Sequence, residues 1–379
     1  MPIRCEYLQT MRKRYARAKS KAEKSMLIDE LVANLNYHRK HAIQVLNDRG
    51  PDERQTAKRN RPLMYTQALP AAQLVWEALD YPCAERLHPV LLSTAERLAT
   101  HGELVLTPEV RAALANISRP TLSRRMRQWS SPKAKRTFIR HKPGLNAEVP
   151  VDRYAWDEAR TGALEIDLVE HNGGSSLGHF AYTLSMTDVV SGYSRRRAIL
   201  GRGQAAVFGA LSLILAELPF AYWALHTDNG SEFLNGHMVK FAKQNKLFFH
   251  RSRPYKKNDN PHVEQKNRQY VREVVGYARY DTPEDVEWLN QVYSVLDVYA
   301  NLFLPMRKVI EKRYEGSRLK KKFDKARTPY QRLKEAGALI KHAELLLSEQ
   351  LATLNPLQLH RELERLLAQG PSLPFTRDA

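Results

Sequence analysis

Apolar and polar residues alternate from residue 163 to 169, which is the period-two pattern of a half-buried strand. Runs at 179–186 and 193–200 predict two further strands, with a turn at 188–192 between them. The apolar pattern then switches between the helical and the strand period. Three strands followed by alternating helices and strands indicate an α/β domain with a mixed sheet. The pattern predicts helices at 204–218, 236–244, 262–276 and 283–303, and strands at 221–227 and 247–250.

Both sides of this block have helical periodicity. Residues 21–47 carry two apolar stripes at helical spacing, and 34–37 would form the tight turn of a helix-turn-helix between them. The second helix would begin where a recognition helix meets base edges and phosphates. A helical hairpin with a charged face is the alternative. The residues at that start, which we predict to contact DNA, are Tyr37, His38, Arg39, Lys40 and His41.

A second helical block runs from about residue 69 to 129. Ser118 has the properties of an N-cap for its last helix, and Leu122 and Met126 repeat at i, i+4. From 118 to 143 there are nine basic residues and no acidic one, whereas a solvated helix usually mixes both signs. We therefore predict DNA contact by the residues on the other faces of this helix, which are Arg119, Thr121, Ser123, Arg124, Arg125 and Arg127.

These patterns predict five segments. They are a helix-turn-helix DNA-binding domain at 1–50, a linker at 51–68, a second helical, helix-turn-helix-like DNA-binding domain at 69–143, an α/β core at 144–305, and a basic C-terminal region with a helical tail at 306–379. The Leu-rich tail indicates packing against a core or a partner.

The charge is distributed unevenly between these segments. Lys and Arg number 60 against 41 acidic residues, which gives a net charge of +19. Residues 151–300 hold 17 basic and 18 acidic residues, so the flanks hold 43 basic and 23 acidic ones. This asymmetry favours a polyanion-binding periphery, and nucleic acid is the leading polyanion. A solvated basic surface is the alternative.

Several classes of protein are disfavoured. There is no apolar run of membrane-spanning length, and the N-terminus has no apolar signal segment. Cys5 and Cys83 make neither a disulfide scaffold nor a zinc finger, which favours a reducing, cytoplasmic setting. No GxxxxGK[ST] run is present, so we expect no nucleotide cofactor.

The candidate chemistry lies in three acidic residues. Asp228 follows a predicted strand in LHTDNGSEF, where it would be either a turn residue or a metal ligand. Asp167 lies in the first strand of the block, in EIDLVEH, and Glu264 begins a later helix, in PHVEQKN. Carboxylates converging at one sheet edge would repel one another unless a cation joined them. Oxygen ligands without a Cys or His cluster favour Mg²⁺ or Mn²⁺ over zinc.

The motifs EIDLVEH, LHTDNGSEF and SRPYKKNDNPHVEQKN resemble the catalytic core of bacterial insertion-sequence transposases and retroviral integrases. The 35 residues between Asp228 and Glu264 match the D,D(35)E spacing of that superfamily, and the resemblance covers about 162–301. It implies a ribonuclease-H-like fold and a catalytic, metal-binding triad of Asp167, Asp228 and Glu264 with two Mg²⁺ or Mn²⁺ ions. A zinc module of the retroviral kind is not implied.

The same resemblance implies a transposase that binds the terminal repeats of a mobile element, frees a 3′-OH and joins it to target DNA. We expect a dimer or larger assembly on double-stranded DNA, associated with the bacterial nucleoid. A nuclease or resolvase that cuts without joining and a catalytically silent DNA-binding regulator are the alternatives. Further DNA contacts are predicted at Lys256 and Lys257, in the loop before Glu264, and at Lys266 and Arg268, after it.

Other readings of single residues stay open at this point. Glu264 and Arg268, at i, i+4, would form a surface ion pair if the helix had no catalytic role. Glu165 is either a fourth carboxylate of the site or a charged neighbour at the sheet surface. The residues interpreted as turn or structural residues are Asp188, Asp259, His171, His226 and His262.

Overall fold

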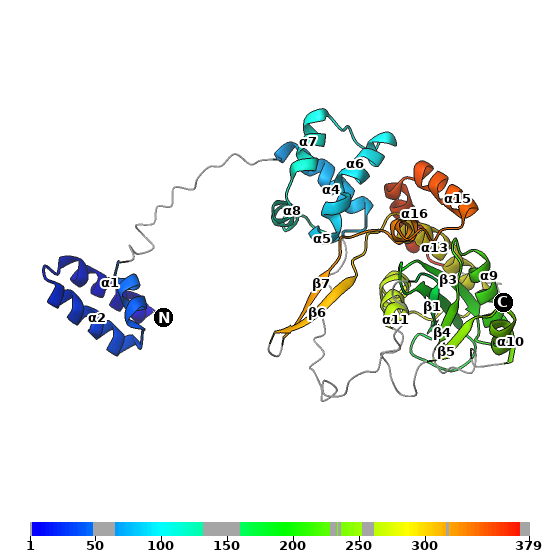
Figure 1. Cartoon of the computed structure of the whole chain (residues 1–379), viewed down its shortest axis with the longest axis horizontal. Helices are drawn as coiled ribbons and strands as arrows, with labels where there is room; N and C mark the ends of the chain where they lie inside the picture. The colour runs from blue at the N-terminus through cyan, green and yellow to red at the C-terminus, as the bar shows by residue number, and fades with distance from the viewer. Residues whose placement is uncertain are drawn as a thin grey trace, which may run out of the picture. The chain divides into compact units, whose positions relative to one another are not determined.

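The computed structural model (Figure 1) describes residues 2–47, 65–131, 160–227, 233, 236–251, 261–315 and 318–371. Contacts divide the chain into two compact units, Met1–Met64 and Tyr65–Ala379. The boundaries expected near 69, 144 and 306 thus lie within or at the edge of the second unit. The DNA-binding roles expected for the helical segments stay predictions.

The first unit contains three helices, α1 (Pro2–Arg17), α2 (Lys21–Leu35) and α3 (Arg39–Asn47). Ser20 begins α2 with a capping box to Glu23, and Asn36 ends it in the left-handed conformation, which reverses the chain before α3. The two helices and the turn expected at 21–47 are confirmed. α1 was not predicted, although it contributes Met11 to the shared core. The other core residues are Leu27, Ile28, Leu31, Ala42 and Leu46.

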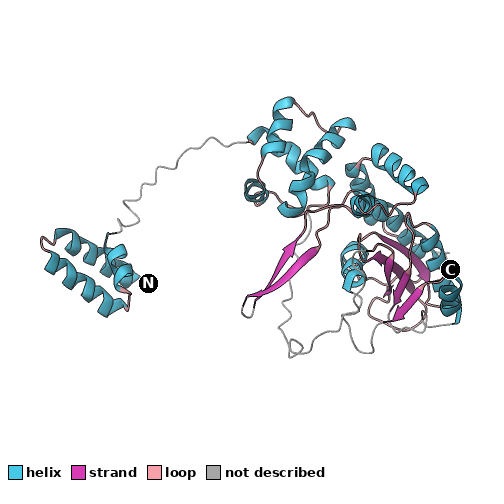
Figure 2. Cartoon of the chain, in the orientation of Figure 1, coloured by secondary structure: helices cyan, strands magenta, loops and turns pink. Residues whose placement is uncertain are grey.

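The second unit contains a five-stranded mixed sheet with the strand order β3-β2-β1-β4-β5 (Figure 2). β1 pairs antiparallel with β2 and parallel with β4, so it lies in the middle of the sheet. The mixed sheet predicted from the sequence is confirmed. The strands are β1 (Ala163–Glu170), β2 (Ala181–Asp188), β3 (Ser194–Leu200), β4 (Ala224–Thr227) and β5 (Phe248–Arg251).

Asp188 ends β2 as a turn residue, as expected from the sequence. Its carboxylate is fully buried and accepts hydrogen bonds from the backbone amides of Gly162, at 2.7 Å, and Ser191, at 2.6 Å. These bonds join the start of β1 to the turn between β2 and β3. His171 is likewise structural, because its buried Nε2 lies 2.7 Å from Thr183 Oγ1, and burial lowers its pKa to about 4.

Helices cover both faces of the sheet. α9 (Gln204–Ala216) packs its apolar side chains on Leu164, Ile166 and Leu184, and α10 (Gly236–Gln244) lies beside β5. The opposite face is covered by α11 (Pro261–Asn267), a π-helical turn at Arg268–Arg272, α12 (Glu273–Val275) and α13 (Pro283–Leu302). The single helix predicted at 262–276 is therefore interrupted, and π turns inside helices are frequent at functional sites.

The helical block before the sheet shares its core with α13 and the C-terminal helices. Tyr299 on α13 donates a hydrogen bond to the carbonyl of Ala78 at 2.9 Å. The block consists of the 3₁₀ turns Thr66–Ala68 and His88–Val90, α4 (Leu69–Ala78), α5 (Ala84–Leu87), α6 (Leu91–Thr100), α7 (Pro108–Asn116) and α8 (Arg119–Met126). The tail comprises α14 (Pro329–Glu335), α15 (Lys341–Thr353) and α16 (Pro356–Gln369).

The basic region at 307–327 forms an antiparallel hairpin of β6 (Val309–Glu315) and β7 (Arg318–Phe323), which the sequence did not predict. It stands apart from the sheet in Figures 1 and 2. Among the described helices, none has the length and apolar content needed to cross a membrane.

Candidate active site

Glu165 on β1 joins the central strand to the helix that carries Glu264. Its side chain is fully buried, and Oε2 accepts hydrogen bonds from the backbone amides of His262, at 2.8 Å, and Val263, at 2.9 Å. These amides belong to the first turn of α11, where a helix has N–H groups without partners of its own and favours a negative charge. The bonds therefore fix the start of α11 against β1.

Asp167 lies two residues further along β1, on the same face of the sheet as Glu165. Its Oδ2 accepts a hydrogen bond of 2.7 Å from Nδ2 of Asn267, the last residue of α11. Its Oδ1 accepts from the backbone amide of Leu168 at 2.9 Å. Both ends of α11 are thus tied to β1, and Glu264, exposed on α11, lies between the two ties.

The electrostatics of Glu165 reflect this gathering of acids. Burial raises the pKa of Glu165 to about 8, the two backbone bonds oppose that rise, and the charges of Glu264 and Asp167 add to it. Its other oxygen, Oε1, is buried without a hydrogen-bond partner among the described residues. The interpretation of Glu165 as a charged neighbour at the sheet surface was therefore wrong. Its alternation with apolar residues did not distinguish a buried from an exposed face.

The stability of the chain should reveal this raised pKa. The folded state holds the proton of Glu165 more tightly than the unfolded chain does. The unfolding free energy should therefore fall as pH rises from about 4.5 toward about 8. Glu165→Gln should remove that component, because an amide stays neutral while its oxygen still accepts both backbone bonds. Melting temperatures in EDTA, with Glu170→Gln at the end of β1 as control, check this. An unchanged pH dependence in Glu165→Gln would contradict it.

Asp228 lies outside the described residues, as do Lys256, Lys257 and Asp259. The described part of β4 ends at Thr227, and β4 runs parallel to β1 with His226 in register with Glu165. The chain that leads to Asp228 is thus the direct neighbour of β1. Within the described ranges, no three His, Cys, Asp or Glu side chains form a group that could hold a metal ion. The third ligand expected from the sequence is not among them.

The donor chemistry of the gathered residues suits a hard divalent cation. Asp167 and Glu264 offer carboxylate oxygens, the ligands that Mg²⁺ and Mn²⁺ prefer. The charges of Asp167 and Glu264 both act on the carboxyl group of buried Glu165 and raise its pKa further. Negative charges that lie close together repel one another, and a bound cation relieves that repulsion.

The two residues after Glu264 that were expected to contact DNA differ in position. Lys266 is buried, its Nζ lies 4.8 Å from the centre of the Tyr270 ring, and burial lowers its pKa to about 7, with the charge of Arg196 adding to the effect. The predicted contact of Lys266 with DNA is therefore wrong, because its ammonium group is buried in the protein. Arg268 is exposed and pairs with Glu273 at 3.5 Å.

The residues expected to meet DNA in the first unit lie at the start of α3. Arg39 pairs with Asp29 and donates to Ser25 at 2.8 Å, which ties α3 to α2. Tyr37 is half-buried and accepts a hydrogen bond of 2.7 Å from Arg4. The remaining three, His38, Lys40 and His41, are exposed.

The candidate residues of α8 also divide by exposure. Ser118 caps this helix by accepting from the backbone amide of Thr121 at 3.4 Å, as the sequence predicted. Arg119, Arg124 and Arg127 are exposed, whereas Thr121, Ser123 and Arg125 are half-buried. The structure thus leaves the guanidinium groups of Arg119 and Arg124 on α8, and of Arg127 at its C-cap, accessible.

Comparison with known proteins found one curated relative, the uncharacterized protein y4rM of Sinorhizobium fredii (strain NBRC 101917 / NGR234). It is 34% identical over 331 residues, which are 85% of this chain and 93% of y4rM. No model of a protein family matches the chain.

Among solved structures, the chain is similar to the catalytic core domain of BIV integrase, at 16% identity and a TM-score of 0.31, covering 46% of this chain and 95% of that one. It is also similar to the HTLV-2 integrase catalytic core domain solved with magnesium. There the identity is 12%, the TM-score 0.29, and the coverage 38% of this chain and 89% of that one.

Proposed function

The chain belongs to the same family as the uncharacterized protein y4rM, and we propose that it is a DDE-type DNA transposase. It would bind the terminal inverted repeats of a mobile DNA element, cut at the 3′ ends and transfer the strands into target DNA. The observation that carries this proposal is the tie between β1 and α11 through Glu165, Asp167 and Asn267. It brings two acids of the D,D(35)E motif, 97 positions apart in the sequence, to one face of the sheet.

The residues proposed to hold the metal are Asp167, Asp228 and Glu264, with two Mg²⁺ or Mn²⁺ ions. Bound divalent ions of this kind stabilise the attacking and leaving oxygens in the displacement of a phosphodiester. The chain's own groups would prepare the place for this chemistry. The Asn267 amide would orient Asp167, and Glu165 holds the start of the helix that carries Glu264. No nucleophilic side chain is required, because a freed DNA 3′-OH attacks the target strand.

Recognition of the DNA ends is assigned to the basic flanks. In this proposal the helix-turn-helix at 1–50 presents His38, Lys40 and His41, and the segment at 69–143 presents Arg119, Arg124 and Arg127 of α8. All six side chains are exposed. A single active site must act at two DNA ends, so the working form is a homodimer or a larger assembly on duplex DNA.

A joining assay tests this function. Purified chain, Mg²⁺ and a labelled duplex that carries the repeats flanking its gene are incubated with a supercoiled target plasmid. We expect labelled strands joined to the plasmid, and none when EDTA is added. Nicked duplex without joined product would favour the nuclease alternative, and binding without any cut strand would favour the regulator.

A further inference from the structure

The β6–β7 hairpin is anchored at its root and exposed along its length. Lys308, just before β6, donates through Nζ to the carbonyls of Val189 and Val190 at the β2–β3 turn, and its backbone amide donates to Asp324 Oδ1 at 2.7 Å. Beyond this root every residue of β6 is exposed. The strands therefore form an arm, defined here as β6 and β7 (Val309–Glu315 and Arg318–Phe323), that is held by its base.

The arm places like charges directly opposite each other on its two strands. Lys312 is paired with Lys321, and Arg313 is paired with Lys320. Like charges in directly opposed cross-strand positions are destabilising. The arm as a whole carries six basic and two acidic residues. The acids form ion pairs, Glu315 with Lys320 and Glu311 with Lys322, but four positive charges remain in excess.

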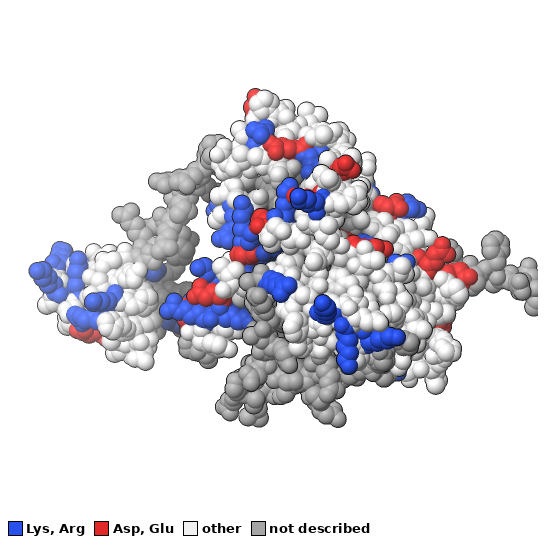
Figure 3. All heavy atoms as spheres, turned by 45° about the vertical axis from the view of Figure 1, so that its right-hand side comes forward, with Lys and Arg blue, Asp and Glu red and all other residues white. Residues whose placement is uncertain are grey.

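Successive cross-strand pairs point to opposite faces of the ribbon. The Lys312–Lys321 pair therefore lies on one face and the Arg313–Lys320 pair on the other. The space-filling view shows Lys and Arg side chains gathered at the arm (Figure 3). A two-stranded ribbon with positive charge on both faces is complementary to a partner that has negative charge on both sides of the ribbon.

The arm also carries exposed apolar side chains. Tyr314 is 74% exposed and Leu319, directly opposite it, is 41% exposed. A single two-stranded hairpin is marginally stable in water, and this one has both like-charge pairs and uncovered apolar side chains. Each of these costs would be reduced by a polyanion that also offers apolar surface to Tyr314 and Leu319.

We propose that the arm enters the major groove of duplex DNA. This inference deepens the proposed function and rests on it. The major groove is about 12 Å wide, admits a two-stranded ribbon, and offers thymine methyl groups to apolar side chains. The two phosphate backbones that border the groove supply negative charge to the Lys and Arg side chains on both faces of the arm.

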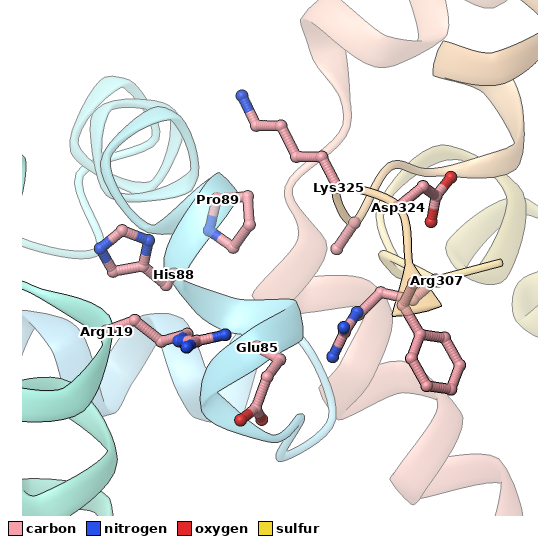
Figure 4. Close-up of a pocket in the computed structure, with 9 residues that line it drawn as sticks. Glu85, His88, Pro89, Arg119, Arg307, Asp324 and Lys325 are labelled. Carbon is pink, nitrogen blue, oxygen red and sulfur yellow. The ribbon is translucent and has the colours of Figure 1, made fainter. Parts of the chain in front are cut away.

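A pocket at the root lies between the hairpin and α8. It is lined by three basic residues, Arg119 at the start of α8 and Arg307 and Lys325 at the two ends of the hairpin, and by two acidic ones, Glu85 and Asp324. Figure 4 shows the side chains of Arg119 and Arg307 on either side of Glu85. A DNA segment that holds the arm in its groove therefore finds further phosphate ligands at the root, next to the helix predicted to contact DNA.

The test measures how salt weakens the binding of the full chain to a mixed-sequence duplex in EDTA, where no strand is cut. Lys312→Gln with Lys321→Gln, and separately Arg313→Gln with Lys320→Gln, should each lower the slope of log K against log salt by about 2. The matched control removes two exposed lysines of α10, Lys240→Gln with Lys243→Gln, and should leave the slope unchanged. Relief of like-charge pairing should keep both arm variants folded, which melting temperatures verify.

Methylation of guanine N7 by dimethyl sulfate reports on the groove. The native chain should protect N7 positions under the arm, and both arm variants should lose that protection. The proposal would be overturned by unchanged slopes or by absent N7 protection. It would also be overturned if the arm variants changed self-association while DNA affinity stayed normal, because the arm would then bind a second copy of the chain. If the native chain joins DNA and the arm variants bind DNA with normal affinity, the proposed role of the arm is wrong and the proposed function stands. If binding depends on the arm but no strand is cut or joined, the proposed transposase function is wrong and the role of the arm stands.

Discussion

Replacing Asp167 with asparagine is expected to lower DNA cutting and joining at least about a thousandfold, while leaving DNA affinity near that of the native chain. The exchange keeps the shape of the side chain and an oxygen that accepts from Asn267, but it removes the negative charge at the centre of β1. Loss of several kcal/mol of stabilisation in the transition state corresponds to such a factor. Cutting is measured on labelled duplex in Mg²⁺, and affinity is measured in EDTA.

The matched control is Glu170→Gln, which removes one negative charge from the end of the same strand. Glu170 accepts a hydrogen bond from Asn172 at 3.2 Å and has no place in the proposed triad. Glu264→Gln should repeat the loss seen for Asp167→Asn, with Glu273→Gln, on α12, as its own control. Native rates in Asp167→Asn or Glu264→Gln would remove that residue from the site.

The second large effect is expected for Asp297→Ala, which should lower the unfolding free energy by about 3–5 kcal/mol. Asp297 on α13 and Arg196 on β3 form an ion pair whose side chains are 2% and 0% exposed. Asp297 also accepts from the backbone amide of Arg196 at 2.8 Å. Truncation would leave a buried guanidinium without its counterion between α13 and the sheet. Urea denaturation followed by circular dichroism measures the loss.

An exposed pair provides the comparison for this measurement. Arg279 and Asp281 lie 2.6 Å apart with side chains 31% and 43% exposed, so Asp281→Ala should cost at most about 1 kcal/mol. The double change Arg196→Met with Asp297→Leu should recover much of the stability, since apolar residues of similar volume replace a buried pair well. A loss for Asp297→Ala no larger than that for Asp281→Ala would show that the pair does not hold α13 to the sheet.

The elements predicted from the sequence are those whose periodicity reflects one buried face. The alternation at 163–169 and the apolar run before Asp228 predicted β1 and β4, which pair in parallel at the middle of the sheet. The β6–β7 hairpin was not predicted because basic residues occupy both of its faces, so no apolar period marks the strands. α1 was missed because its short apolar side is spaced among Arg and Lys residues.

Within the candidate site, motif spacing was the basis for choosing Asp167, Asp228 and Glu264, whose catalytic role stays a proposal. It was not sufficient for Glu165 and Lys266. An acid between two apolar positions has the same pattern whether its face meets water or a helix. A lysine beside Glu264 is equally compatible with a surface contact and with the pocket formed by Tyr270 and Met306.

By itself, the sequence determined the mixed sheet, the helical flanks with their excess of positive charge, and the three acids proposed for catalysis. These features depend on the local hydrophobic period, the composition and the order of motifs, which are all properties of the amino-acid sequence. Only the tertiary structure decided that Glu165 ties α11 to β1, that Lys266 is buried, and that the basic C-terminal stretch is a projecting ribbon. Burial and hydrogen bonding arise between residues about a hundred positions apart, and their packing is set by the whole fold.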